Sequence, residues 1–206
     1  MAALILAFDL GTTGNKASLF AADGYPLASQ VSAYPTAYAR PGWAEQNPED
    51  WWASLCQATA GLLSASRHSA EDIAVVSFSG QMMACLPLDA AGAPLRPALI
   101  WADSRAEEEA RWLAERVGGE RVYAITGHRA SASYTAAKAL WLRAHEPEVW
   151  GRTAHLLQAK DYVAYRLTGE YATDYSDASG TNLFDLEGRA WSVEIADAIG
   201  LDLGLL

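Results

Sequence analysis

A glycine-bounded turn near the N-terminus constrains the fold of this chain more than any other feature of its sequence. Residues 4–8 are a continuous apolar run, a turn with a glycine at each end spans 11–14, and residues 17–20 resume a strand-like composition. Two apolar runs on either side of a glycine-rich turn predict a β-hairpin. A second turn at 23–24 and a partly alternating segment at 27–33 extend the prediction to a three-stranded meander.

Helices and short strands alternate along the rest of the chain. Asn47 before Pro48 is typical of a helix start, and apolar residues at helical spacing continue to about Ser66. Further strands are predicted at 73–78, 84–88 and 99–101, and further helices at 107–117, 136–144, 160–167 and 193–199. The alternation indicates an α/β fold, and the sequence shows no repeat, low-complexity tract or linker.

The composition restricts the partners that we expect. A chain of 206 residues with 51% hydrophobic content can bury a core without disulfides, and Cys56 and Cys85 both lie in apolar runs, so we expect reduced thiols that pack as small hydrophobes. The net charge of −10, without a run of Lys and Arg, argues against nucleic-acid and anionic-membrane partners. No stretch is apolar enough to span a membrane, and Asp9 interrupts the apolar run that a signal peptide would need. We therefore expect a cytoplasmic protein.

The first turn also carries chemistry that suits a triphosphate. The residues concerned are Asp9, Gly11, Thr12, Thr13, Gly14 and Lys16. The two glycines permit positive φ and close backbone approach, the two threonines offer N–H and O–H donors to an anion, and the lysine adds a positive charge. A carboxylate repels phosphate but suits a Mg²⁺ ion, held through water, that bridges phosphate oxygens. The pattern alone leaves an ordinary hairpin turn as the alternative.

Five sequence blocks in a fixed order carry a family resemblance. They are DLGTTGNKA at 9–17, GWAEQNPEDWW at 42–52, SGQMM at 79–83, LRPALIWADSR at 95–105 and AKDYVAYRLTGEYATDYSDASGT at 159–181. Together they resemble the FGGY carbohydrate kinases, and in particular their xylulokinase-like branch, over essentially the whole chain. The resemblance implies an α/β domain of the actin-like, ribonuclease-H-like type, in which helices flank a mixed sheet.

The resemblance also implies an activity and a domain arrangement. Such kinases transfer the γ-phosphoryl group of ATP to a sugar or polyol hydroxyl, so we expect ATP and Mg²⁺ as cofactors and a small sugar as substrate. Residues 1–206 would be the N-terminal, sugar-binding domain, whereas the catalytic base and most of the adenosine surface would belong to a C-terminal kinase domain. We therefore expect the isolated chain to have little or no kinase activity. The sequence does not fix the oligomeric state, and a homodimer stays open.

Individual site residues follow from the matched positions. Asp9 matches the family's magnesium-associated aspartate, and the phosphate-binding positions correspond to Gly11, Thr12, Thr13 and Lys16. The sugar-binding positions correspond to Gln81, Met82, Met83, Trp101, Asp103, Arg105, Ser133 and Tyr134. An indole face against sugar C–H groups, with carboxylate and guanidinium partners for hydroxyls, suits a polyol.

Simpler explanations compete for several of these residues. Trp101 could pack in the core, Asp103 and Arg105 could form a helix cap and a surface ion pair, and the two methionines could fill gaps in the core. Met83 also departs from the family pattern, because xylulokinase-like members commonly have a histidine there that can hydrogen-bond the ketose. D-xylulose therefore leads the candidate substrates, with other pentuloses, pentitols, hexuloses and gluconate open.

The remaining motifs carry no predicted chemistry. The GWAEQNPEDWW block is explained by a helix cap and core tryptophans, and Asp174, Ser176 and Asp177 are more typical of turns and caps than of a cleft. The four histidines lack metal-ligand spacing. Two other functional classes stay open, an actin- or Hsp70-like ATPase and a non-catalytic sugar-sensing domain.

Overall fold

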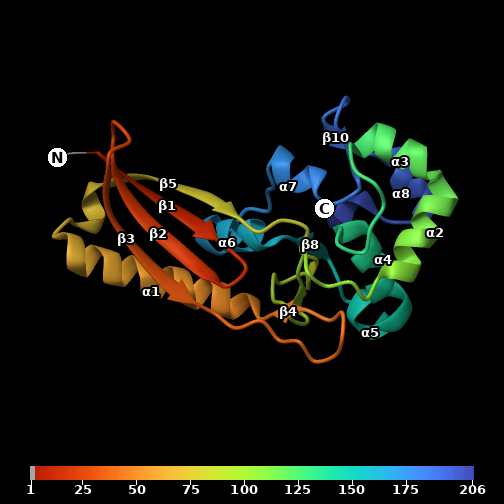
Figure 1. The fold of residues 1–206 in the computed structure, drawn as a ribbon, viewed down its shortest axis with the longest axis horizontal. Helices are drawn as coiled ribbons and strands as arrows, with labels where there is room; N and C mark the ends of the chain where they lie inside the picture. The colour runs from red at the N-terminus through yellow and green to blue at the C-terminus, as the bar shows by residue number, and fades with distance from the viewer. Residues whose placement is uncertain (1–2) are drawn as a thin grey trace.

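The predicted hairpin forms the start of a four-stranded mixed sheet in the computed structural model, which describes residues 3–206 (Figure 1). The sheet has the order β3-β2-β1-β5 and consists of β1 (Leu4–Leu10), β2 (Gly14–Ala21), β3 (Pro26–Ala33) and β5 (Ile73–Gly80). β1 and β2, and β2 and β3, pair antiparallel, so the predicted meander is confirmed. β5 pairs parallel to β1, which makes the sheet mixed and confirms the predicted fold class.

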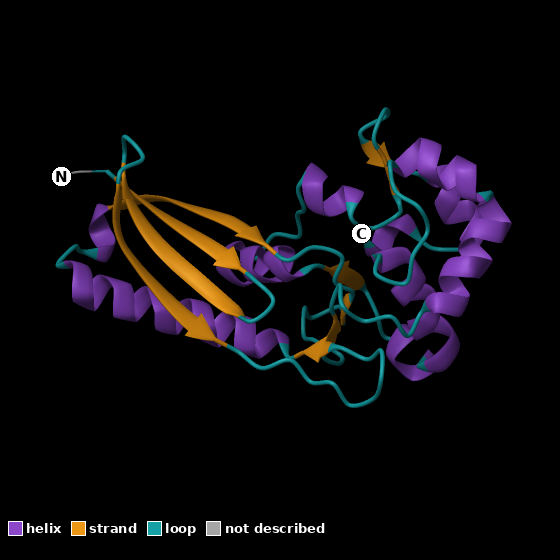
Figure 2. Ribbon diagram, in the orientation of Figure 1, coloured by secondary structure: helices purple, strands orange, loops and turns teal. Residues whose placement is uncertain are grey.

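Helices α1 (Pro48–Ser66) and α6 (Ala159–Thr168) pack against one face of this sheet (Figure 2). Every second residue of β1 points to that face and is buried, as the period of two in a strand requires. Trp51 and Leu62 from α1 lie in the same core. The predicted helix start is confirmed, because the side chain of Asn47 accepts a hydrogen bond from the backbone N–H of Glu49 at 3.2 Å.

The opposite face of the sheet is polar at one end of the strands and apolar at the other. Next to the turn, Asp9 is paired in register with Lys16 on β2 and with Ser79 on β5, and all three side chains are exposed. Toward the other end, Ile5 is paired with Phe20 and Val75 and the row is apolar. The polar end of this face therefore lies beside the predicted phosphate turn.

A second core lies among the helices in the other half of the molecule (Figure 1). The helices there are α2 (Glu107–Val117), α3 (Gly119–Thr126), α4 (Thr135–His145), α5 (Pro147–Trp150), α7 (Tyr175–Ser179) and α8 (Val193–Ile199). Short strands join the two halves or close loops, namely β4 (Glu45–Gln46), β6 (Leu86–Leu88), β7 (Ala98–Leu99), β8 (His155–Leu157), β9 (Phe184–Asp185) and β10 (Ala190–Trp191). Single 3₁₀ turns occur at Ala70–Asp72 and Leu203–Leu205.

Most predicted elements are present, with corrections at their ends. The helix predicted at 107–117 has those bounds, whereas three helices and four short strands were not predicted, namely α3, α5, α7, β4, β8, β9 and β10. The strand predicted at 99–101 ends at Leu99, so Trp101 lies in a turn. Both cysteines are free; Cys85 is buried as expected, but Cys56 is exposed, so its predicted burial is wrong. Within residues 3–206 no helix is both long and apolar enough to cross a bilayer.

The pairing of β1 with β5 depends on a close approach at Gly80. A Cβ at this position would lie 3.0 Å from both the Cβ and the carbonyl oxygen of Leu10, and 3.2 Å from Cγ of Lys160. The first two of these atoms belong to a fully buried residue of the central strand and have little room to move. Gly80 therefore allows the end of β5 to lie against the end of β1.

We expect Gly80→Ala to lower the free energy of unfolding by about 1–3 kcal/mol, because the added methyl group overpacks this contact. Gly119→Ala is the matched control. A Cβ at Gly119 meets nothing within 4 Å at the start of α3, so this change should be neutral or stabilise the protein by up to about 1 kcal/mol. Urea unfolding of both variants checks the prediction, and equal stabilities would contradict it.

Candidate active site

The turn between β1 and β2 is closed by a backbone hydrogen bond and supported by Tyr34, the residue that follows β3. The N–H of Gly11 donates to the carbonyl of Gly14 at 3.0 Å, and the hydroxyl of Tyr34 donates to the carbonyl of Gly11. Burial, reinforced by the charge of Asp9, raises the pKa of Tyr34 well above its usual value, so this hydroxyl stays a donor. Thr12 is partly exposed and Thr13 is exposed, so both can reach a ligand.

The glycines of this turn act differently from the prediction. Neither Gly11 nor Gly14 has a positive φ, so that part of the prediction is wrong. Close approach is confirmed at Gly14, where a Cβ would lie 2.8 Å from the carbonyl oxygen of Ser32 on β3. Gly14 therefore allows the start of β2 to lie close to the end of β3.

Asp9 and Lys16 present one carboxylate and one ammonium on the polar end of the open sheet face. Both side chains are exposed and lie on adjacent strands in register. Residues 3–206 contain no group of three or more His, Cys, Asp or Glu side chains that could form a metal cage. A single exposed carboxylate fits Mg²⁺, because this ion keeps several waters and commonly takes only one or two protein carboxylates together with substrate phosphates.

The segment that follows β5 lies directly beside the phosphate turn. The N–H of Gln81 donates to the carbonyl of Leu10 at 2.7 Å. From a separate loop, the indole Nε1–H of Trp101 donates to Oγ1 of Thr12 at 2.9 Å, and this side chain is 43% exposed. The core-packing alternative for Trp101 is therefore wrong. One predicted sugar-binding residue and one predicted phosphate-binding residue are in direct contact.

Asp103 and Arg105 occupy a different environment from the one predicted. Their side chains are 0% and 1% exposed, and the guanidinium group donates to both oxygens of Asp103 and forms an ion pair with Glu45 at 2.7 Å. It also lies over the ring of Trp43, 3.6 Å from the centroid, and the backbone N–H of Ala44 donates to Asp103 at 2.6 Å. The helix-cap and surface-pair alternatives are wrong, because α2 has no side-chain cap and the ion pair is buried.

This burial changes the role that we assign to the pair. Neither side chain offers an exposed charged group to a sugar, since their charges are neutralised within the cluster. The side chain of Asp103 accepts from the backbone N–H of Ala44, so the pair ties the loop that carries Trp101 to the segment before β4. Asp103 and Arg105 thus support the wall of the site from behind.

Lys138, which was not predicted, joins two groups of predicted sugar-binding residues. It is fully buried on α4, and its Nζ donates to the carbonyl of Met83 at 2.7 Å and to the carbonyl of Ser133. Met83 has a φ of 64°, a left-handed conformation that is unusual for a residue other than glycine. Its N–H donates to Oε1 of Gln158 at 2.5 Å, so buried side chains hold both of its peptide groups. Tyr134 lies next to Ser133, just before α4.

The sequence contains a signal that could have identified Lys138 as a buried residue. It stands in the run Ala-Ala-Lys-Ala-Leu-Trp-Leu, where all residues of α4 from 135 to 142 are buried. A lysine on the buried part of a helix needs partners for its ammonium group. Burial lowers the pKa of Lys138 to about 7. A lysine pKa lowered by burial in this way is more typical of a functional site than of a surface helix.

The TDYSDASGT segment confirms the predicted cap and adds a buried acid. Asp174 caps α7 and accepts from the backbone N–H groups of Ser176 and Asp177. Asp177 itself is fully buried, and its nearest cation is Nζ of Lys160 at 3.3 Å. Burial, followed by the charge of Asp161, raises the pKa of Asp177 to about 7.

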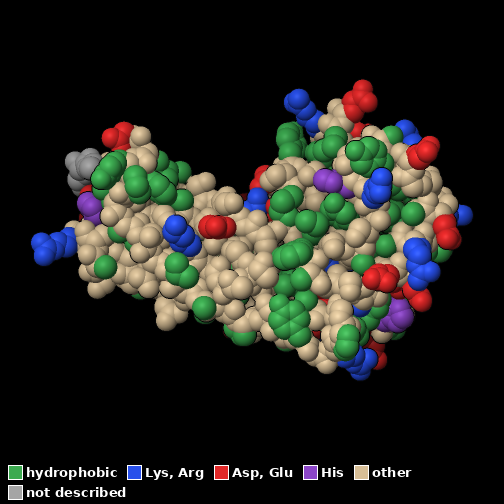
Figure 3. Space-filling view, viewed as in Figure 1, with side chains coloured by type: hydrophobic (Ala, Val, Ile, Leu, Met, Phe, Trp, Pro, Cys, Tyr) green, Lys and Arg blue, Asp and Glu red, His purple; other side chains and the backbone are tan. Residues whose placement is uncertain are grey.

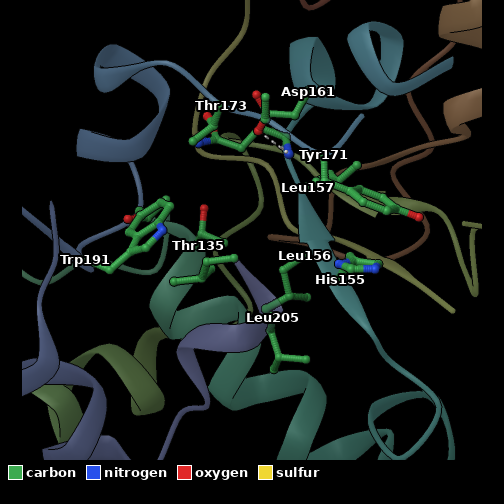
Figure 4. A pocket seen from close by; sticks show the side chains of 13 residues that line it. Thr135, His155, Leu156, Leu157, Asp161, Tyr171, Thr173, Trp191 and Leu205 are labelled. Carbon is green, nitrogen blue, oxygen red and sulfur yellow. Dashed lines mark hydrogen bonds between the residues drawn. The ribbon is translucent and has the colours of Figure 1, made fainter. Parts of the chain in front are cut away.

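A pocket of about 210 Å³ lies near this region and contains none of the predicted site residues (Figure 4). Gln158, Asp161 and Thr135 line it together with Leu205 and Leu206. It adjoins the candidate site at Gln158, which holds Met83, and at Thr135, which follows Tyr134 and donates to the carbonyl of Ala84. The surface is also hollowed between the sheet half and the helical half of the molecule (Figure 3).

We expect Asp177→Asn to flatten the pH dependence of stability. The pKa of Asp177 rises from an unfolded value near 3.8 to about 7 in the folded protein, so the folded state holds the proton more tightly across this interval. Raising the pH from about 4 to 7 therefore costs the wild type up to about 1.4 kcal/mol per pH unit at this group, and the amide removes that loss.

Thermal unfolding between pH 4.5 and 8 measures the effect. The advantage of Asp177→Asn over the wild type should grow with pH up to about 7 and then stay constant. Asp23→Asn removes an exposed carboxyl in the β2–β3 turn and tests whether any carboxyl-to-amide change has the same effect. A pH-independent difference between Asp177→Asn and the wild type would refute the prediction.

Known proteins resemble this chain in sequence and in fold. Residues 4–206 match the model of the FGGY family of carbohydrate kinases, N-terminal domain. The chain is 38% identical to a xylulose kinase of Bacillus subtilis, with 96% of this chain and 39% of that protein aligned.

Solved structures show the same similarity in three dimensions. A "xyloylose kinase" from Brucella ovis has a TM-score of 0.94 at 34% identity, over 98% of this chain and 42% of that one. A gluconate kinase from Lactobacillus acidophilus has a TM-score of 0.87 at 26% identity, over 98% and 40%. The chain thus spans about two fifths of the length of these relatives. Since the family model matches nearly all of its residues, the chain belongs to the FGGY family of carbohydrate kinases.

Proposed function

We propose that the full-length protein is an ATP- and Mg²⁺-dependent kinase that phosphorylates a hydroxyl group of a small sugar, with D-xylulose as the first candidate. The observation that carries this proposal is the hydrogen bond between Trp101 and Thr12, at 2.9 Å. It joins an exposed indole, which suits the C–H face of a sugar, to a turn whose donors suit phosphate. Phosphoryl transfer requires such a pair of subsites side by side.

Each residue would have a limited role in this reaction. Thr12, Thr13 and Lys16 would hold phosphate oxygens of the nucleotide, within the turn closed at Gly11. Asp9 would hold Mg²⁺ through water. When bound, the ion would neutralise part of the negative charge on the phosphate oxygens.

The sugar would lie against the other wall of the site. Trp101 provides the apolar surface, and the segment Gln81, Met82 and Met83 lies beside the phosphate turn. Ser133 and Tyr134 extend this wall, since Lys138 ties Ser133 to Met83. With Met83 in place of a histidine, we propose that backbone and amide groups, rather than an imidazole, orient the hydroxyls of the ketose.

We further propose that a second domain completes the site. This domain would supply the adenosine surface and the carboxylate that accepts the proton of the sugar hydroxyl, and residues 1–206 would form the sugar-binding domain. The length of the relatives, of which this chain spans about two fifths, supports the proposal. Whether two copies of the full-length protein associate is a separate question, which gel filtration answers.

The substrate can be identified with a panel of ketoses, polyols and gluconate, each tested with ATP and Mg²⁺ on the full-length protein. We expect ADP release that depends on D-xylulose. Asp9→Asn should lower this activity roughly 10- to 100-fold, as the loss of an outer-shell metal partner does, while Asp23→Asn serves as the control. Activity with none of the sugars would overturn the proposed function.

Measurements of ADP release and of thermal stability on the same proteins distinguish a kinase from the two other functional classes. An actin- or Hsp70-like ATPase would hydrolyse ATP without sugar and would not be stabilised by it. A non-catalytic sugar-sensing domain would bind sugar equally well with Asp9→Asn and release no ADP. A kinase should show both sugar-dependent ADP release and sugar-dependent thermal stabilisation.

A further inference from the structure

One buried side chain outside the predicted site, Gln46, connects the phosphate turn to the sugar-binding segment. It lies on β4, directly before the cap of α1, and is 2% exposed. Its Nε2 donates to the carbonyl of Thr12 and to Oγ1 of Thr36, both at 2.7 Å. Its Oε1 accepts from Nε1 of Trp51 at 2.8 Å and from Nε2 of Gln81 at 2.7 Å. The amide therefore makes four hydrogen bonds.

The chemistry of the partners fixes the orientation of this amide. An indole N–H can only donate, so the atom of Gln46 that faces Trp51 must be the oxygen. A backbone carbonyl can only accept, so the atom that faces Thr12 must be the nitrogen. The two assignments agree, and a flipped amide would lose both bonds.

The orientation of Gln81 then follows. Since Gln46 presents its oxygen, Gln81 must present its NH₂ group, which leaves Oε1 of Gln81 as an acceptor. This oxygen is buried and finds no hydrogen-bond partner among residues 3–206. A buried amide oxygen without a partner is costly, and a hydroxyl group of a ligand would satisfy it.

We infer that Gln46 is a positioning residue that holds the phosphate turn and the sugar-binding segment at a fixed separation. The inference rests on the proposed kinase function, in which these two segments carry the two reactants. A reactant displaced by about 1 Å can cost on the order of 100-fold in rate. The backbone bond from Gln81 to Leu10 is a second tie between the segments. The bond from Trp101 to Thr12 ties a separate loop to the same residue of the turn that Gln46 holds.

The experiment replaces Gln46 in the full-length protein. Gln46→Glu has the same shape, but its second oxygen would face the carbonyl of Thr12 and repel it. Gln46→Met fills the space and removes all four hydrogen bonds. We measure kcat with D-xylulose, or with the best substrate of the panel, and the Kd values of the sugar alone and of a non-hydrolysable Mg²⁺–ATP analogue alone.

We expect Gln46→Glu to lower kcat on the order of 100-fold, while each separate Kd changes by no more than a few-fold. Gln46 touches neither reactant in this arrangement, so a purely structural role would instead weaken both Kd values and the thermal stability together. Thr126→Val is the matched control. Its hydroxyl is buried in α3, and its hydrogen bonds go to Val122, His128 and Asn182, none of which is a proposed site residue. It should lose stability but keep kcat.

The outcomes are distinguishable. A kcat within about threefold of the wild type for both Gln46 variants overturns the inference, as does a loss of kcat that Thr126→Val reproduces at equal stability. A wild type that phosphorylates no sugar overturns the proposed function instead. Trp51→Phe removes the donor that fixes the amide orientation, together with part of a buried ring, and should lower kcat less than Gln46→Glu does. An unchanged kcat in Trp51→Phe counts against the inference even where neither Gln46 variant folds.

Discussion

The parallel pairing of β1 with β5 determines where every other part of the candidate site can lie. Parallel strands bring their carboxyl ends to the same edge of a sheet, so the turn after β1 and the segment after β5 become neighbours although about 70 residues separate them in sequence. Gly80 allows the two strand ends to approach, and the bond from Gln81 to Leu10 extends the pairing by one residue. An antiparallel β5 would place the Gln81 segment at the far edge of the sheet, away from the turn.

Buried polar groups, rather than apolar packing, fix the surface of the site. Lys138 holds Met83 and Ser133, the pair of Asp103 and Arg105 holds the loop of Trp101, and Gln46 holds Thr12 and Gln81. Each of these groups loses hydration on burial, and only specific partners offset that cost. Apolar contacts alone would tolerate small slips between segments. Directional hydrogen bonds do not, so support of this kind would suit the alignment of two reactants in the proposed site.

Local signals in the sequence were sufficient to predict the first hairpin and the longer helices of the fold. The pair Asn47-Pro48 gave the start of α1, the glycine-bounded turn gave the first hairpin, and the helix at 107–117 was predicted to its last residue. Short elements were missed because they carry too few residues for a periodic pattern. β8 has three residues, and α3 begins directly after the glycine that ends α2.

Side-chain burial could not be read in the same way. Asp103 and Arg105 stand two and four positions from the exposed Trp101, and only their burial and the packing of Trp43 against Arg105 show that they point inward. Gln46 was overlooked because its block already had a structural explanation as a cap and core. Its role depends on Thr12 and Gln81, which lie 34 and 35 residues away in sequence. Tertiary contacts of this kind leave no local pattern.

The acidity of the chain sets a final constraint on how phosphate could be held. With a net charge of −10, the protein offers no broad positive field to a polyphosphate. Charges separated by more than about 8 Å are largely screened at physiological salt, so only the charges and dipoles close to the turn affect phosphate binding there.

In the view of Figure 3 the charged side chains gather on the helical half, and the sheet half shows few. At the turn itself Asp9 and Lys16 balance each other, so binding there would rely on directed N–H and O–H donors and on the metal's own charge. Such a site discriminates by geometry, which makes the fixed separation between Thr12 and Gln81 more important than net electrostatic attraction.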